Sequence, residues 1–193
     1  MQKIYLCRHG ETEWNITKQH TSFTDIALTE NGIKQASLLK NRFKDKKFSA
    51  VLTSPYQRAK KTCELAGFEG IVENDLVEWN YGDFEGLTTQ QIQEKILDWS
   101  VFKYGCDGGE SVDDVTKRGY DMVKKLSKIK GDVIIFTHGH FSRALIASWL
   151  GLTAKEGRYF SSSNASLSIL GYEHNERILK LLNDTCHLKT DYH

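Results

Sequence analysis

The chain has 193 residues, which suits one domain of ordinary size, and we expect a single domain over residues 1–193. Its formal net charge of +1 at pH 7 provides no overall field for a polyanion, so we expect neither nucleic acid nor a membrane surface as a partner. The sequence contains no run of about 18 apolar residues, and it therefore predicts no transmembrane helix.

The first apolar run begins at Ile4, which leaves no room for a secretion signal before it, and we expect a cytoplasmic location. Four scattered cysteines lack the close spacing of a metal site, so free thiols are expected: Cys7, Cys63, Cys106 and Cys186. The sequence leaves the oligomeric state open, and a homodimer is one of the states compatible with it.

The opening run from Ile4 to Cys7 predicts a buried strand, and Arg8, His9 and Gly10 follow it directly. Open α/β sheets bind ligands at the carboxyl ends of their strands, where these residues would lie. A guanidinium binds phosphate oxygens and a neutral imidazole can attack phosphorus, so the pair suits a phosphate ester. The glycine removes a Cβ where a ligand could approach the backbone closely.

Residues 16–27 form a polar segment, and we interpret it as a loop whose hydroxyl groups could donate to a bound phosphate. Thr29 is a suitable N-cap for a helix over residues 30–43. The inner face of that helix is expected to comprise Ile33, Ala36, Leu39 and Phe43. A second strand is predicted over residues 48–53, and a short apolar segment follows at residues 71–72.

The second strand runs into Ser54 and Pro55, a pair that predicts a helix N-cap followed by the first helical residue. A helix that begins at the carboxyl end of a strand points the positive end of its dipole at the ligand edge. Arg58 would lie in the first turn of this helix and could reach the same anion.

Residues 76–86 combine two glycines with several aromatic residues, which favours a compact loop. Three carboxylates lie in this loop, on Glu78, Asp83 and Glu85. A phosphatase needs one acid that protonates the leaving oxygen and then activates water. The residue pattern alone does not select one of the three for that role.

Two helices are predicted in the next part of the chain, with a loop between them. The first covers residues 88–99 with Thr88 as its cap, and the second covers residues 111–129. Ser111 and Asp114 are spaced as a capping box at the start of the second helix.

The clearest strand covers residues 132–137, a continuous apolar run typical of a parallel sheet, and it ends at His138 and Gly139. A helix over residues 141–150 follows it. The chain closes with predicted strands at residues 166–170 and 177–182, and a loose tail is expected from residue 183.

A second imidazole at the sheet edge, on His138, could hold phosphate oxygens and stabilise the charge of the transferring group. His140, two residues later, is a further candidate for the pocket. These two residues and His9 could instead ligate a metal ion, because histidine is a common metal ligand. Arg8 and Arg58 would repel a divalent cation from the same pocket, so we expect no metal.

Together these motifs resemble the signature of the histidine phosphatase superfamily, also called the phosphoglycerate mutase-like family. The matching segments occur in family order: Arg8-His9-Gly10-Glu11-Thr12-Glu13-Trp14-Asn15, Ser54-Pro55-Tyr56-Gln57-Arg58-Ala59, the acid at Glu78, and His138-Gly139. The resemblance implies an α/β fold with three layers, α/β/α, around a mostly parallel central sheet.

The resemblance also implies roles for individual residues. His9 would attack phosphorus and carry a phosphohistidine, and Glu78 would donate the proton to the leaving oxygen. Arg8, Arg58 and His138 would bind the non-bridging oxygens, and no cofactor would be needed. Glu85 would be structural and bond backbone amides in its loop. The family's substrate contacts fall at Asn15, Thr21, Ser22 and the backbone amide of Gly139.

Members that act as mutases carry a longer insertion between the proton donor and the last His-Gly strand, so the short segment here favours a hydrolase. Residues 78–86, 105–110 and 138–143 are similar to the sedoheptulose bisphosphatase branch, which acts on sugar phosphates. That similarity adds Tyr81 and Arg143 as contacts for the rest of a small phosphate ester. A phosphoglycerate mutase, a protein phosphohistidine or phosphoserine phosphatase and a silent phosphate-binding module are the alternatives.

Overall fold

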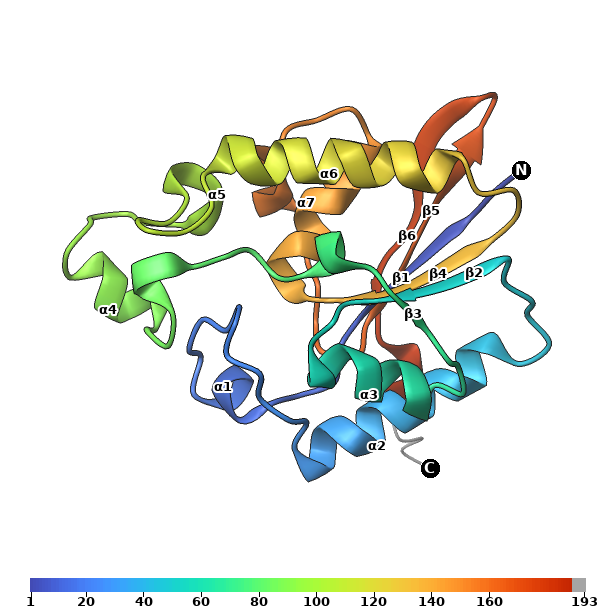
Figure 1. Ribbon diagram of the computed structural model, residues 1–193, viewed down its shortest axis with the longest axis horizontal. Helices are drawn as coiled ribbons and strands as arrows, with labels where there is room; N and C mark the ends of the chain where they lie inside the picture. The colour runs from blue at the N-terminus through green and yellow to red at the C-terminus, as the bar shows by residue number, and fades with distance from the viewer. Residues whose placement is uncertain (189–193) are drawn as a thin grey trace.

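The computed structural model describes residues 1–188 and shows a six-stranded sheet with helices on both of its faces (Figure 1). The strand order is β3-β2-β4-β1-β5-β6, and within the described residues β5 is the one strand that runs opposite to the other five. This is the predicted three-layer arrangement with a mostly parallel sheet. The strands are β1 (Ile4–Arg8), β2 (Ala50–Thr53), β3 (Ile71–Val72), β4 (Val133–Thr137), β5 (Leu167–Glu173) and β6 (Glu176–Asp184).

Helices α2 and α3 cover one face of the sheet, and α6 and α7 cover the other (Figure 1). The α-helices are α1 (Glu13–Ile16), α2 (Glu30–Leu38), α3 (Gln57–Leu65), α4 (Thr89–Gln93), α5 (Val101–Tyr104), α6 (Val112–Ser127) and α7 (Gly139–Trp149). Short 3-10 helices are η1 (Leu39–Phe43), η2 (Asn74–Leu76), η3 (Gly82–Phe84), η4 (Ala154–Tyr159) and η5 (Cys186–Leu188).

The central strands bury side chains on both faces. In β1, Ile4 and Leu6 belong to the core shared with α6 and α7, whereas Tyr5 and Cys7 belong to the core shared with η1 and α3. Successive side chains of a strand point to opposite faces, so a sheet covered on both sides needs a continuous apolar run. This explains why the run that begins the chain shows no polar alternation.

The predicted helix over residues 30–43 is one α-helix, α2, followed directly by η1. Ala36, Leu39 and Phe43 are buried as predicted, but Ile33 is 41% exposed. The backbone of Gly32 packs against Glu11, where an added Cβ would come within 2.1 Å of the carbonyl oxygen. The turn that faces the protein therefore carries Gly32 and Ala36, and Ile33 lies one position round the helix.

The prediction of a helix over residues 88–99 was wrong in length, because α4 ends at Gln93. Asp98 has a φ of 57°, a left-handed conformation that an α-helix does not contain. By contrast, α6 begins as predicted, with Ser111 accepting from the Asp114 N–H and the Asp114 side chain accepting from the Ser111 N–H.

The end of the chain is more ordered than predicted. β5 and β6 form a hairpin whose turn residues, His174 and Asn175, both have positive φ, as a two-residue turn of this kind requires. β6 continues to Asp184, which pairs with Arg42, and a ring nitrogen of His187 contacts the Ala165 carbonyl at 3.0 Å. The predicted tail is thus wrong for residues 183–188, and its remainder lies outside the described residues.

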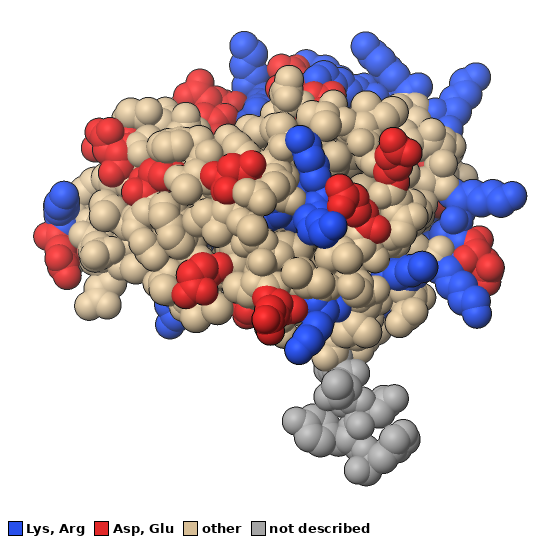
Figure 2. Space-filling model, turned by 60° about the horizontal axis from the view of Figure 1, so that its bottom comes forward, with Lys and Arg blue, Asp and Glu red and all other residues tan. Residues whose placement is uncertain are grey.

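Acidic and basic side chains are interspersed over the face that carries α2 and α3 (Figure 2). Within residues 1–188, none of the helices combines the length and the hydropathy that a bilayer span requires. The cysteines are free thiols, as predicted.

Candidate active site

The ends of three parallel strands place the first site residues side by side. Both β1 and β2 pair in parallel with β4, and the residues that follow these strands are His9, Ser54 and His138. The His9 and His138 rings lie 5.2 Å apart, and His138 Nε2 lies 2.7 Å from Ser54 Oγ. The topology of the sheet thus brings together residues that are far apart in the sequence.

His9 is held in the form that a nucleophile needs. Its Nδ1 lies 2.7 Å from the Gly10 carbonyl oxygen, an acceptor, so Nδ1 carries the hydrogen and donates it. Nε2 then holds the lone pair. Burial, together with the positive charges of Arg58 and Arg8, lowers the pKa of His9 well below the ordinary histidine value. The ring is therefore neutral near pH 7.

A cavity of about 150 Å³ lies over His9, which itself is only 4% exposed. Its walls come from β1 and the loop after it, from the segment around Glu78 and from the start of α7. The cavity is lined by Arg8, His9, Asn15, Gln19, His20, Thr21, Glu78, Tyr81, Gly139, His140, Arg143 and Ser162. Most of the predicted site residues are in this set, but Arg58, His138 and Ser22 are outside it.

Arg58 and His138 lie behind the cavity rather than in its wall, and both are fully buried. The Arg58 guanidinium donates to the carbonyl oxygens of Ser22 and Thr24 at 2.9 and 3.0 Å, and its Nε donates to His138 Nδ1 at 3.2 Å. Since His138 Nδ1 accepts, its Nε2–H donates to Ser54. Their predicted contact with phosphate oxygens stays a prediction.

Arg8 reaches the cavity from the end of β1. Its Nη1 donates to the Ser162 carbonyl at 2.6 Å, while its buried Nε has no hydrogen-bond acceptor in the described part of the chain. A Cβ added to Gly139 would stand 3.2 Å from both Nε and Cζ of Arg8. The glycine of the second His-Gly motif therefore makes room for the arginine of the first.

Glu78 is the carboxylate that lines the cavity. Its Oε1 accepts from the backbone N–H groups of Trp79 and Phe141 at 2.9 and 2.7 Å, and its Oε2 accepts from the His140 N–H at 3.0 Å. Two of these donors lie in the first turn of α7, where free N–H groups favour an anion. Oε1 thus accepts two hydrogen bonds and Oε2 only one among the described residues, which leaves a free lone pair on Oε2.

Tyr81, His140 and Arg143 form the wall beyond Glu78. Tyr81 Oη and His140 Nδ1 are 2.5 Å apart. Burial raises the pKa of Tyr81 and lowers the pKa of His140, so both are neutral and the hydroxyl donates to the imidazole. Arg143 lies 4.3 Å above the Phe102 ring and donates to the Gly157 carbonyl at 3.0 Å.

The loop after β1 places Asn15 and Thr21 in the wall of the cavity, whereas Ser22 does not line it. Ser22 is 3% exposed, and its N–H and hydroxyl both donate to Glu85, which also accepts from the Thr24 N–H. The structural role predicted for Glu85 is confirmed. Asn15 Oδ1 accepts from the Asn164 side chain at 2.8 Å, which leaves the Asn15 amide nitrogen to donate to a ligand.

Two local predictions at the site were wrong. Ser54 and Pro55 do not begin α3, whose cap is Tyr56, because the Ser54 hydroxyl is engaged by His138. Gly10 does not open the backbone to a ligand, since an added Cβ there would stand 2.4 Å from the Gly32 carbonyl oxygen. The glycine is needed for packing of the first loop against α2.

Gln19, His20 and Ser162 line the cavity without having been predicted. They lie in loops, where no periodicity or motif distinguishes a pocket residue from a solvated one. The described residues contain no group of three or more histidine, cysteine, aspartate or glutamate side chains placed to hold a metal ion.

The fold and the site together define an α/β enzyme built to handle a phosphoryl group. The chain belongs to the histidine phosphatase superfamily, whose branch 1 sequence model matches residues 4–185. It is 40% identical over 190 residues to an acid phosphatase of Mycobacterium tuberculosis, covering 96% of this chain and 94% of that protein. The chain is thus a phosphatase, a phosphoric monoester hydrolase.

A solved structure from Mycobacterium tuberculosis, also 40% identical, superposes with a TM-score of 0.90 and covers 94% of this chain and 97% of that one. Sedoheptulose 1,7-bisphosphatase of Saccharomyces cerevisiae is 30% identical over 184 residues, which cover 78% of this chain and 68% of that protein. Relatives named phosphoglycerate mutase also match, at 35% identity in one case. The likeness therefore spans hydrolases and mutases.

Proposed function

We propose that this chain hydrolyses phosphomonoesters of small metabolites, sugar phosphates in particular, through a phosphohistidine on His9. One observation carries the proposal: a neutral His9 with its Nε2 lone pair free shares a cavity with Arg8, whose buried Nε has no acceptor in the described residues. A nucleophile and an unused cationic donor around one small space suit a tetrahedral anion.

The reaction follows in two steps from these groups. First, His9 Nε2 attacks phosphorus, the bond to the ester oxygen breaks, and protonated Glu78 gives its proton to that oxygen. Second, the Glu78 carboxylate takes a proton from water and the resulting hydroxide attacks phosphorus. The nitrogen–phosphorus bond breaks, which returns neutral His9 and releases inorganic phosphate.

Positive charge for the transferring group comes from the protein in this proposal. Arg8 lines the cavity, and Arg58 donates to His138, whose ring lies 5.2 Å from that of His9. Preorganised donors of this kind stabilise the charge of a phosphoryl group in transit. We therefore expect turnover to be unaffected by a chelator such as EDTA, and a loss that added metal restores would contradict the proposal.

The dimensions of the site favour a small substrate. The cavity holds about 150 Å³ and His9 is buried beneath it, which suits a compact ester better than a phosphorylated protein surface. The similarity to sedoheptulose 1,7-bisphosphatase supports a sugar phosphate. Tyr81 and Arg143 stand where they could contact the sugar.

A phosphoglycerate mutase is the second candidate, because relatives of that name match much of the chain. The two activities differ in where the phosphoryl group goes. Incubation with 3-phosphoglycerate releases inorganic phosphate if the chain is a hydrolase, and yields 2-phosphoglycerate if it is a mutase.

The decisive experiment compares two histidine variants on a panel of sugar phosphates and p-nitrophenyl phosphate. His9→Asn removes the nucleophile and should reduce phosphate release to background. His174→Asn, in the exposed β5–β6 turn, is the matched control and should behave as the wild type, because asparagine tolerates the positive φ there. Wild-type enzyme quenched during turnover should carry an acid-labile phosphoryl group that His9→Asn lacks. Full activity of His9→Asn would refute the mechanism.

A further inference from the structure

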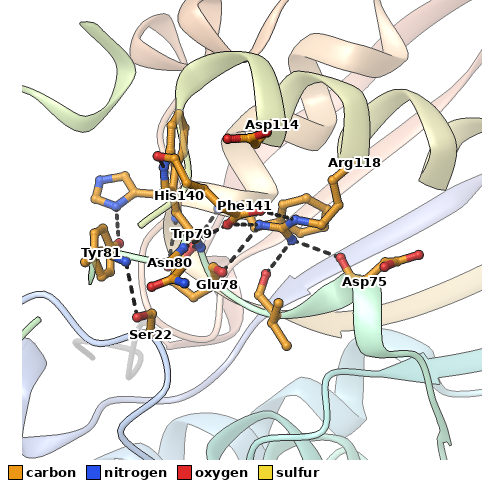
Figure 3. Close-up of polar contacts among 12 residues, drawn as sticks. Ser22, Asp75, Glu78, Trp79, Asn80, Tyr81, Asp114, Arg118, His140 and Phe141 are labelled. Atoms are coloured by element: carbon orange, nitrogen blue, oxygen red, sulfur yellow. Dashed lines mark hydrogen bonds and ion pairs between the residues drawn. The ribbon is translucent and has the colours of Figure 1, made fainter. Parts of the chain in front are cut away.

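Arg118, in α6, joins the segment that carries Glu78 to the helix layer (Figure 3). Its Nη1 donates to the carbonyl oxygens of Asp75 and Val77 at 3.0 and 2.9 Å, and its Nη2 lies 3.4 Å from the Glu78 carbonyl oxygen. One guanidinium thus binds three carbonyl groups of the four-residue stretch that ends at the proton donor.

Glu110 holds the same segment on the other side of Glu78. Its Oε2 accepts from the Asn80 N–H at 2.9 Å, and its carbonyl accepts from the Trp79 indole N–H at 2.9 Å. Its own N–H donates to the Asn80 carbonyl at 2.9 Å. Three hydrogen bonds from Glu110 therefore hold the two residues immediately after the proposed proton donor.

The two side chains are themselves locked together. Arg118 Nε and Nη2 donate to the two carboxylate oxygens of Glu110 at 2.9 and 2.8 Å, a bidentate ion pair. The exposed fractions of their side chains are 12% and 21%. Because desolvation offsets much of the attraction in such a pair, it adds little stability, whereas the fork geometry fixes orientation.

Arg118 also contacts Phe141, which donates a hydrogen bond to the carboxylate of Glu78. Its guanidinium lies 4.0 Å above the ring of Phe141, the residue whose backbone N–H donates to Glu78 Oε1 at 2.7 Å. The same side chain therefore contacts the backbone that carries Glu78 and the helix residue that holds its carboxylate (Figure 3).

We propose that Arg118 and Glu110 are positioning residues for proton transfer from Glu78. Neither lines the cavity, so they act through Glu78 and not on the substrate. The proposal rests on the proton-donor role proposed for Glu78 above. Misplacement of a reacting group by about 1 Å can cost on the order of a hundredfold in rate. We call the contacts that Arg118 and Glu110 make with residues 75–80 the clamp, and loosening it should act mainly on proton transfer.

The dependence of rate on the leaving group tests this proposal. An alkyl ester such as β-glycerophosphate needs a proton on its leaving oxygen, whereas p-nitrophenyl phosphate expels a stable phenolate and needs little help. The ratio kcat/KM covers only the steps up to release of the alcohol, so it reports on that proton transfer. Inhibition by inorganic phosphate measures the anion site separately.

Two variants loosen the clamp to different degrees. Both carboxylate oxygens of Glu110 accept hydrogen bonds. In Glu110→Gln, the new amide N–H₂ group would therefore face another donor, either the Arg118 guanidinium or the Asn80 N–H. Arg118→Lys keeps the charge but cannot serve two carboxylate oxygens and three carbonyls together. For both, kcat/KM on the alkyl ester should fall about ten- to a hundredfold. On the aryl ester it should change less than about threefold, with inhibition by phosphate unchanged.

Lys125→Met is the matched control, because Lys125 also lies in α6 and pairs with Glu73 and Asp75 at 3.1 and 2.6 Å, but is exposed. It should leave both esters at the wild-type rate. Glu78→Gln is the reference for complete loss of the proton donor and should show the largest difference between the two esters.

The outcomes separate the two proposals. If Glu78→Gln slows both esters equally, the role proposed for Glu78 fails. If Glu78→Gln discriminates between the esters while the folded Glu110→Gln and Arg118→Lys variants do not, only the positioning role fails. Circular dichroism and thermal unfolding establish that each variant is folded. If Arg118→Lys does not fold, Glu110→Gln, which keeps the size of its side chain, decides the question.

Discussion

Gly139→Ala offers a test of how closely Arg8 must be placed. The new Cβ would stand 3.2 Å from Cζ and Nε of Arg8 and 3.5 Å from Nη1, whereas ordinary contact begins at 3.4 Å and extends to 4 Å. The guanidinium must therefore move by a few tenths of an ångström. Its Nη1 is tied to the Ser162 carbonyl at 2.6 Å, so this movement displaces the group from its present position.

The expected loss follows from that displacement. If about 1 Å of misplacement costs on the order of a hundredfold, a shift of roughly 0.2 to 0.4 Å costs about 3- to 6-fold in kcat/KM. The affinity for inorganic phosphate should weaken in parallel, because Arg8 is a proposed anion contact. Stability should change by less than about 1 kcal/mol, because the helix preference for alanine and the close contact with Arg8 act in opposite directions.

Steady-state kinetics with p-nitrophenyl phosphate, inhibition by phosphate and thermal unfolding measure these three quantities. Ser142→Ala is the control in the same helix, because it removes a buried hydroxyl without a partner among the described residues and adds no atom. It should remain within about twofold of the wild-type rate. A folded Gly139→Ala variant with wild-type kcat/KM and phosphate affinity would show that Arg8 does not bind the phosphoryl group as proposed.

Three further predictions concern stability. Burial lowers the pKa of His9, His20 and His138 below the ordinary histidine value of 6.5. The unfolded chain therefore binds more protons below that pH, and the free energy of unfolding should fall between pH 6.5 and 5 in urea titrations; a constant value would contradict this. Glu85→Ala should lower the free energy of unfolding by about 2–3 kcal/mol, because Ser22 and Thr24 lose their acceptor; an unchanged urea midpoint would refute it. Ser148→Ala should leave the melting temperature unchanged or raise it, because the Ser148 hydroxyl is buried without a partner in the described residues; a clear decrease would show that the hydroxyl is satisfied.

The sequence predicted the elements whose signals are local. The apolar run of β4 and the capping box of α6 are read from neighbouring residues, and both were placed correctly. The predicted helix could not extend to Trp99 because Asp98 adopts a left-handed conformation, which no local preference requires. Ile33 was assigned to the wrong face because close packing of Gly32 against the first loop sets the rotation of α2.

The same distinction explains what was predicted of the site. Arg8, His9 and Glu78 were identified from motifs, and the topology brings their side chains into one cavity. Ser54 fits a local capping rule, yet a long-range partner, His138, engages its hydroxyl. Arg118 was missed because its position among the lysines of α6 is typical of a solvated helix face.

The proposed nucleophile, His9, and the proposed proton donor, Glu78, have separate supports in this fold. His9 is fixed by its own strand end, through the Gly10 carbonyl and the Thr137 carbonyl of β4. Glu78 is fixed by the helix layer, through the first turn of α7 and through Arg118 of α6. Because these supports are separate, we expect a change in α6 to weaken the proposed proton transfer while phosphate affinity is kept. Gly139 begins α7, which holds Glu78, and it also packs against Arg8, so a side chain there should disturb anion binding first.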